Sequence, residues 1–113
     1  MATRQSFLRA AAEAFGTAAA RGHKPSLEVL LHHNEHGILL SSAVFALQKP
    51  AVKGDKEAID FLVNVINNDS DKALWMGASQ GLVMAANQGD EGAKMALAKY
   101  AEYEANRNKS QAP

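Results

Sequence analysis

The stretch Ala86-Asn87-Gln88-Gly89-Asp90-Glu91 decides the fold, because it joins two segments of helical periodicity and two earlier stretches share its form. In each stretch a glycine suited to a left-handed helix end precedes a polar residue that can start the next helix. The glycines Gly22, Gly54 and Gly89 are 32 and 35 residues apart, which is the period of helix–turn–helix repeats. A glycine followed by an N-cap residue is also common between any two successive helices. The pattern therefore does not decide whether the chain contains true repeats. The earlier stretches are Ala19-Ala20-Arg21-Gly22-His23-Lys24 and Ala51-Val52-Lys53-Gly54-Asp55-Lys56.

The segments on both sides of these glycines have helical composition and spacing. Alanine is abundant and proline occurs only at positions 25, 50 and 113, so long stretches lack a helix breaker. Asp55 and Asp90 are expected N-caps, and Pro50 is expected to end the third helix. The predicted fold class is all-α, with about six helices arranged as helical hairpins in a short α-solenoid-like stack or a compact bundle. The expected helices cover about 3–20, 26–36, 38–48, 56–67, 71–87 and 91–106.

The length of 113 residues fits one domain, and we expect a single all-helical domain over 1–106 with a flexible C-terminal tail over 107–113. The chain has no cysteine and a net charge of zero, which disfavours disulfides, thiolate metal sites and nucleic acid as a partner. No apolar run approaches the roughly 20 residues of a membrane span, and no signal peptide is apparent. We therefore expect no membrane association and a cytoplasmic location.

A stripe of small residues runs along the fifth expected helix. Gly77, Gly81 and Ala85 follow one another at four-residue spacing, so they share one face of the helix. Such a stripe allows another helix to approach closely, although each glycine costs about 1 kcal/mol in helix propensity relative to alanine.

The segment Ala85-Ala86-Asn87-Gln88-Gly89-Asp90-Glu91-Gly92-Ala93 resembles the junction between helices in Sel1-type repeats, relatives of tetratricopeptide repeats. Lys72, Ala73 and Trp75 are similar to the start of the preceding helix in that family, so the resemblance covers about residues 72–98. The aromatic-glycine pattern expected after Ala93 is absent, and the helix before it is longer than in the family. The resemblance implies a protein-binding scaffold without an active site.

All four histidines lie between residues 23 and 36. If one helix covers 26–36, His32 and His36 lie one turn apart, and Glu28 continues the line. This spacing can bind a divalent transition metal such as zinc, nickel or copper. The run from His32 to His36 also fits the His-x-x-Glu-His pattern of inverted zinc peptidases, but those enzymes need a third ligand and a walled cleft, so no enzyme activity is expected.

A second alternative is a helix-turn-helix DNA reader over residues 73–87. Ala73, Gly77 and Val83 have the spacing of the small residue, turn glycine and apolar residue of that motif. Ser79 and Gln80 would then begin the recognition helix and reach base edges. At the position of Lys72 the helix-turn-helix motif has a buried aliphatic residue. A continuous helix with a stripe of small residues for packing explains the same pattern.

The favoured hypothesis is a non-enzymatic protein–protein interaction or scaffolding module without a cofactor, with a homodimer as one form of the interaction. Helical hairpin layers form grooves that bind partners through exposed aromatic and polar side chains. The candidate partner-binding residues are His33, Lys94, Tyr100 and Tyr103, beside the candidate metal ligands His32, His36 and Glu28.

Overall fold

The computed structural model describes the backbone of residues 4–68 and 71–111 and the side chains of residues 7–68 and 71–106. These residues form six α-helices and one short 3-10 helix, which confirms the predicted all-α class. The elements are α1 (Arg4–Ala20), α2 (Lys24–Leu31), η1 (His33–His36), α3 (Leu40–Val52), α4 (Lys56–Asn68), α5 (Lys72–Asn87) and α6 (Glu91–Gln111).

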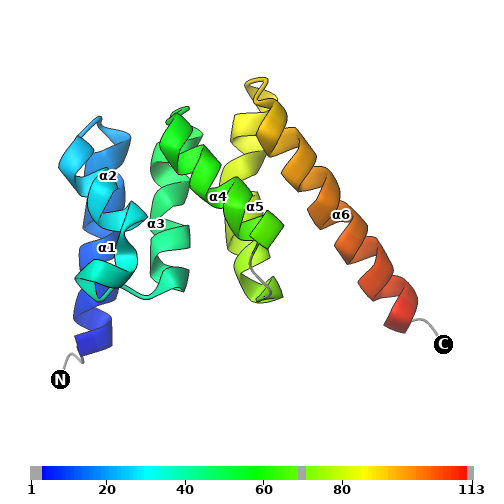
Figure 1. Ribbon diagram of the computed structural model, residues 1–113, viewed down its shortest axis with the longest axis horizontal. Helices are drawn as coiled ribbons and strands as arrows, with labels where there is room; N and C mark the ends of the chain where they lie inside the picture. Colours follow the sequence, from blue (N-terminus) through cyan, green and yellow to red (C-terminus); the bar gives the residue numbers. More distant parts are fainter. Residues whose placement is uncertain (1–3, 69–70, 112–113) are drawn as a thin grey trace.

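The helices form two layers, with α1, α3 and α5 side by side in one and α2, α4 and α6 in the other (Figure 1). Each odd-numbered helix forms an antiparallel hairpin with the even-numbered helix that follows it. Within the described residues, α1 contacts α2 and α3 but neither α5 nor α6, so the layers do not close into a ring. The molecule is a flat, open stack of 45 × 36 × 20 Å. At the C-terminal end of the stack, α6 is tilted away from the other helices (Figure 1).

The three hairpins turn in the same way. Gly22, Gly54 and Gly89 all have positive φ angles, of 94°, 89° and 101°. This backbone conformation is energetically unfavourable for a residue that has a β-carbon. The residue after each glycine donates its backbone N–H to a carbonyl five residues earlier, which closes a Schellman cap. These bonds run from His23 to Ala18 (3.0 Å), from Asp55 to Pro50 (3.0 Å) and from Asp90 to Ala85 (3.1 Å).

Aspartates cap three of the helices. Asp55 Oδ1 accepts the backbone N–H of Ala58 at 3.1 Å, and Asp90 Oδ1 accepts that of Ala93 at 2.8 Å. Both predicted caps are therefore confirmed, because each satisfies a donor that the first turn of a helix leaves unpaired. Asp71 caps α5 in the same way.

The core lies between the two layers. Each layer contributes the apolar stripe of its helices, which is the arrangement expected when amphipathic helices pack face to face. The large side chains that are fully buried include Leu27, Leu30, Val44, Leu47, Leu62, Ile66 and Leu82.

The predicted ends of the third and second helices are wrong. The third helix does not end at Pro50 but continues to Val52, because the proline ring is buried and tertiary packing outweighs its cost in the helix. The second helix ends at Leu31 rather than 36. From there a tighter 3-10 turn and the left-handed Gly37 reverse the chain so that Ile38 enters the core.

Two glycines of the stripe on α5 lie against α3, which confirms that another helix approaches the stripe closely. A β-carbon at Gly77 would lie 3.2 Å from Val44 Cγ1, and one at Gly81 would lie 3.2 Å from the Cα of Gln48. Gln48 also donates a hydrogen bond to the carbonyl of Gly77 at 2.5 Å. The stripe therefore brings the two helices together.

The last helix is longer than the sequence suggested. It continues past residue 106 to Gln111, into the segment that we expected to be a flexible tail. Residues 112 and 113 lie outside the described residues.

Candidate functional site

The predicted histidine site lies on a helix end and a 3-10 turn instead of on one helix. His32 caps the C-terminus of α2, and His36 lies at the far end of η1. His32 Nε2 is 3.3 Å from Glu28 Oε2, and both side chains are about half exposed. The structure thus brings together two of the three predicted ligands.

His36 does not join this pair. Among the described residues, no group of three or more His, Asp or Glu side chains is close enough to hold a metal ion. Two protein ligands leave most of a transition metal's coordination sphere to water, whereas stable structural zinc sites use four protein ligands. Metal binding by His32, His36 and Glu28 stays a prediction.

His33 packs against the protein. Its ring meets the ring of Phe61 edge-on, with centroids 5.8 Å apart and planes at 89°. Its Nδ1 atom is buried and has no hydrogen-bond partner. Burial lowers the pKa of this imidazole, and a contact with the backbone of Leu30 opposes that shift. This side chain contributes to packing between η1 and α4.

The two tyrosines of α6 are half-buried. The ring of Tyr103 lies 5.2 Å from that of Trp75, and Trp75 is only 3% exposed. The Nζ atom of Lys72 is 3.5 Å from the centre of the Trp75 ring, a cation–π contact. Tyr103 therefore helps to pack α6 against the stack.

The remaining predicted partner-binding residue, Lys94, is exposed on α6 and lies 3.4 Å from Glu91. Lys94 and Glu91 are three residues apart on α6, so they form an ion pair within one helix. The structure does not unite His33, Lys94 and the tyrosines in one surface, because η1 and α6 pack on different parts of the even-numbered layer (Figure 1).

The helix-turn-helix interpretation is wrong. It needs a turn at Gly77, but α5 is one continuous helix from Lys72 to Asn87. Ser79 is 7% exposed, and its hydroxyl donates to the carbonyl of Met76 at 2.8 Å. Gln80 is exposed but hydrogen-bonded to Gln48 of α3. Ser79 and Gln80 therefore do not begin a recognition helix.

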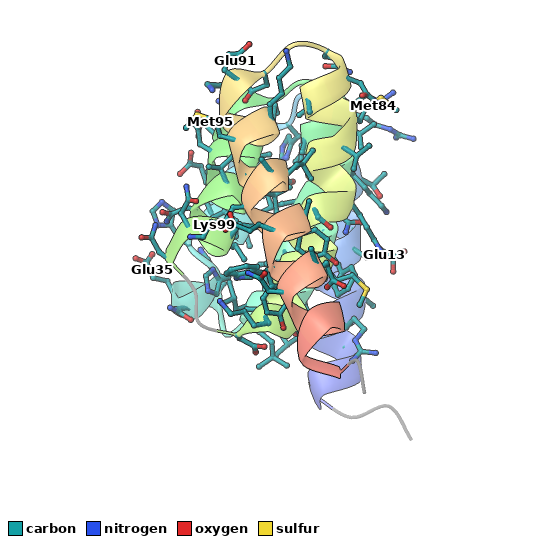
Figure 2. All side chains as sticks on the ribbon, turned by 90° about the vertical axis from the view of Figure 1, so that its right-hand side faces the viewer. Glu13, Glu35, Met84, Glu91, Met95 and Lys99 are labelled. Atoms are coloured by element: carbon teal, nitrogen blue, oxygen red, sulfur yellow. The ribbon has the colours of Figure 1, made fainter. Side chains whose placement is uncertain are left out.

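The sequence interpretation missed a surface on the outer side of α1, α3 and α5, which we call the odd face. On α3 its members recur at helical spacing: Ser41, Phe45, Lys49 and Val52 are all exposed. Figure 2 shows the stack end-on, with Glu13 of α1 and Met84 of α5 projecting from one side and Glu35 and Met95 from the other. The odd face consists of Arg9, Glu13, Thr17, Ser41, Phe45, Lys49, Val52, Gln80 and Met84.

Phe45 is the largest apolar group of the odd face. Its side chain is 54% exposed, whereas its neighbours Val44 and Leu47 on α3 are fully buried. The ring lies against α5, since a β-carbon on Gly77 would be 3.4 Å from Phe45 Cζ. The phenyl ring therefore spans two helices of one layer while much of its surface meets solvent.

A groove runs between α1 and α3 on the odd face and contains two hollows. The first, of about 430 Å³, is lined by residues that include Arg9, Glu13 and Phe45. The second, of about 590 Å³, is lined by residues that include Arg21, Val52 and Lys53. Lys49 lines both hollows, and its Nζ is 2.9 Å from Thr17 Oγ1.

The groove offers little acid–base chemistry. Among the described residues that line the two hollows, the titratable groups are Glu13 and basic side chains, with no histidine. The hydroxyls of Ser41 and Ser42 thus have no neighbouring imidazole of the kind that activates a serine nucleophile. Its apolar and basic groups are better suited to binding than to bond breaking.

Comparison with protein-family models, curated proteins and solved structures finds no match for this chain. Within the described residues, no helix combines the length and apolar character needed to cross a membrane.

Proposed function

We propose that this protein is a non-enzymatic protein–protein interaction scaffold that works in the cytoplasm and binds its partner on the odd face. The observation that supports this proposal is the exposure of Phe45, at 54%, beside a groove between two packed helices. Aromatic side chains next to a hollow are typical anchors of protein interfaces.

Exposed apolar groups concentrate on two adjacent helices. Most of the large apolar side chains that are exposed belong to α3 and α5, whereas Phe7, Leu39 and Met95 lie elsewhere. Exposed apolar side chains that gather on neighbouring helices mark interaction sites more often than isolated exposed residues do. The members on α3 and α5 are Phe45, Val52, Met76, Val83 and Met84.

The proposal agrees with what the resemblance of residues 72–98 to Sel1-type repeats implies. A stack of hairpins presents one continuous face from successive helices, which is how helical-repeat proteins bind partners. The partner in this proposal is another protein, and a second copy of this chain is the simplest alternative occupant of the same face.

A pull-down with matched variants tests the proposal. The wild-type protein, a double variant Phe45→Ala and Met84→Ala, and the control Met95→Ala would each be incubated with lysate of the source organism, with and without nuclease. We expect a partner that survives nuclease, is retained by Met95→Ala and is lost by the double variant. Partners that bind all three proteins equally would contradict the proposal.

Light scattering of the same proteins would detect a homodimer. If the second copy is the partner, the wild-type protein and Met95→Ala have twice the monomer mass, and the double variant is a monomer. A dimer that persists in the double variant would place self-association elsewhere.

A further inference from the structure

The groove between α1 and α3 is basic, although the chain as a whole has a net charge of zero. Four cationic side chains line its two hollows, together with one carboxylate. This excess of positive charge attracts negatively charged groups to the groove. The cations are Arg9, Arg21, Lys49 and Lys53, and the carboxylate is Glu13.

Most of these cations have no carboxylate partner among the residues whose side chains the structure describes. Lys49 Nζ is 3.9 Å from Glu13 Oε1. Among the described residues, Arg9, Arg21 and Lys53 take part in no ion pair. On the even-numbered helices, by contrast, Lys24 is 2.7 Å from Glu57, and Lys56 is 3.2 Å from Asp90.

The positive charges flank apolar surface. Phe45 lies in the hollow that contains Arg9, and Val52 lies in the hollow that contains Arg21 and Lys53. Each hollow therefore combines an apolar side chain with a cation, and Lys49 lies between the two hollows. A ligand that fits both hollows carries apolar groups near its centre and negative charges at its ends.

The dimensions fit a short peptide. Arg9 lies on α1 and Arg21 directly follows its last residue, so the two are roughly 18 Å apart along the helix axis at the rise of an α-helix. An extended chain of about five or six residues spans that length at about 3.3 Å per residue.

From this arrangement we infer that the groove between α1 and α3 binds an acidic peptide segment of a partner protein, with bulky apolar side chains between its carboxylates. The inference rests on the proposed function and names the chemistry of its partner. Phosphate-rich nucleic acid would also be attracted to the cations, but the apolar walls at Phe45 and Val52 favour a peptide with bulky apolar side chains.

Fluorescence anisotropy with defined peptides tests the inference on the full-length protein. The probe is a fluorescein-labelled peptide of roughly eight residues, with glutamates at both ends and leucines at the centre. One matched peptide carries glutamine in place of glutamate, and another carries serine in place of leucine. We expect the probe to bind at least about tenfold more tightly than either matched peptide and to lose affinity as salt rises. Equal binding of the glutamine peptide would overturn the inference.

Matched variants locate the site. Arg21→Gln combined with Lys53→Gln is expected to weaken probe binding about tenfold, while Lys24→Gln on the even-numbered layer leaves it unchanged. Circular dichroism confirms that each variant folds. An equal loss in Lys24→Gln, or displacement of the probe by a single-stranded oligonucleotide at lower concentration than by unlabelled peptide, would contradict the inference.

The two proposals can fail separately. If the acidic peptide does not bind but the pull-down partner still depends on Phe45 and Met84, only the inference about acidic chemistry fails. If neither binding depends on residues of the odd face, the proposed function fails as well.

Discussion

The carbonyl oxygen of Ala46 in α3 lies against Gly16 of α1, 2.5 Å from the point where a β-carbon on that glycine would be. Residue 50 is proline, so this carbonyl lacks the N–H that normally bonds to it four residues along a helix. Gly16 has no β-carbon and is buried against α3, and its Cα–H group can offer the oxygen a weak hydrogen bond. The proline in α3 and the glycine in α1 therefore form one packing feature.

We predict that Gly16→Ala destabilises the protein by about 1–3 kcal/mol, because the new methyl group meets rigid backbone. Gly77→Ala is the matched control: its methyl group would lie 3.2 Å from a Val44 side-chain atom, and the gain in helix propensity of about 1 kcal/mol offsets that contact. Urea denaturation followed by circular dichroism measures both changes. If Gly16→Ala were as stable as the wild type, the close approach of α1 and α3 would be wrong.

The packing of His33 predicts a dependence of stability on pH. Burial lowers the pKa of this imidazole in the folded protein, so the unfolded chain takes up the proton first, at its ordinary pKa of about 6.5. The stability that neutral His33 contributes is thus present above that pH and is lost as the pH falls through it. We expect the urea midpoint to fall between about pH 8 and pH 5.5.

The controls assign this effect to one histidine. His33→Leu should have a flatter profile, and His32→Gln and His36→Gln, which change exposed side chains, should keep the wild-type profile. A wild-type slope in His33→Leu would show that other groups cause the pH dependence.

The cap of α6 predicts a second effect, at acid pH. The backbone N–H of Ala93 holds the pKa of Asp90 below its usual range, burial opposes this, and Lys56 lowers the pKa further. The stability from Asp90 is present above the ordinary aspartate pKa of about 3.9 and is lost as the pH falls below it.

Two substitutions at Asp90 separate the cap from the charge. Asp90→Ala should cost about 1 kcal/mol at neutral pH through loss of the cap. Asp90→Asn should keep most of the cap and reduce the acid sensitivity. Thermal unfolding at neutral pH and near pH 3 measures the stability of both variants. If Asp90→Asn lost as much stability at acid pH as the wild type, the assignment to Asp90 would be wrong.

Trp75 is the only tryptophan of the chain and reports on the packing of α6. Tyr103→Ala removes the ring that lies 5.2 Å from it. We expect a red shift of the tryptophan emission and a loss of about 1–2 kcal/mol in the free energy of unfolding. Met95→Ala, which changes a side chain that is 73% exposed, should leave the emission unchanged. An unchanged spectrum in Tyr103→Ala would mean that α6 does not cover Trp75.

Local signals in the sequence predicted much of this fold. The turns at Gly22, Gly54 and Gly89 and the caps at Asp55 and Asp90 depend on residues within one or two turns of each other. Such features can be read from a sequence because the backbone conformation alone requires them. These turns predicted hairpins, whereas the choice between an open stack and a compact bundle was left open by the sequence.

The features that the sequence did not predict depend on distant contacts. Pro50 continues a helix because of the packing around α3, and the histidine segment leaves the helix at Leu31 so that Ile38 can be buried. The odd face was missed for the same reason. In an apolar helix such as α3, the sequence alone does not show which side chains face solvent, because that depends on where the neighbouring helices pack. Phe45 lies on the outer side of α3, which the even-numbered helices do not cover.

Photo-crosslinking from opposite faces tests the central claim most directly. A benzophenone amino acid replaces Phe45 on the odd face in one protein and Met95 on the other side in a second (Figure 2). Both proteins are irradiated in lysate of the source organism. A binding role for the odd face predicts a discrete protein adduct from position 45 and none from position 95. The same adduct from both positions, or an adduct from position 95 alone, would contradict it.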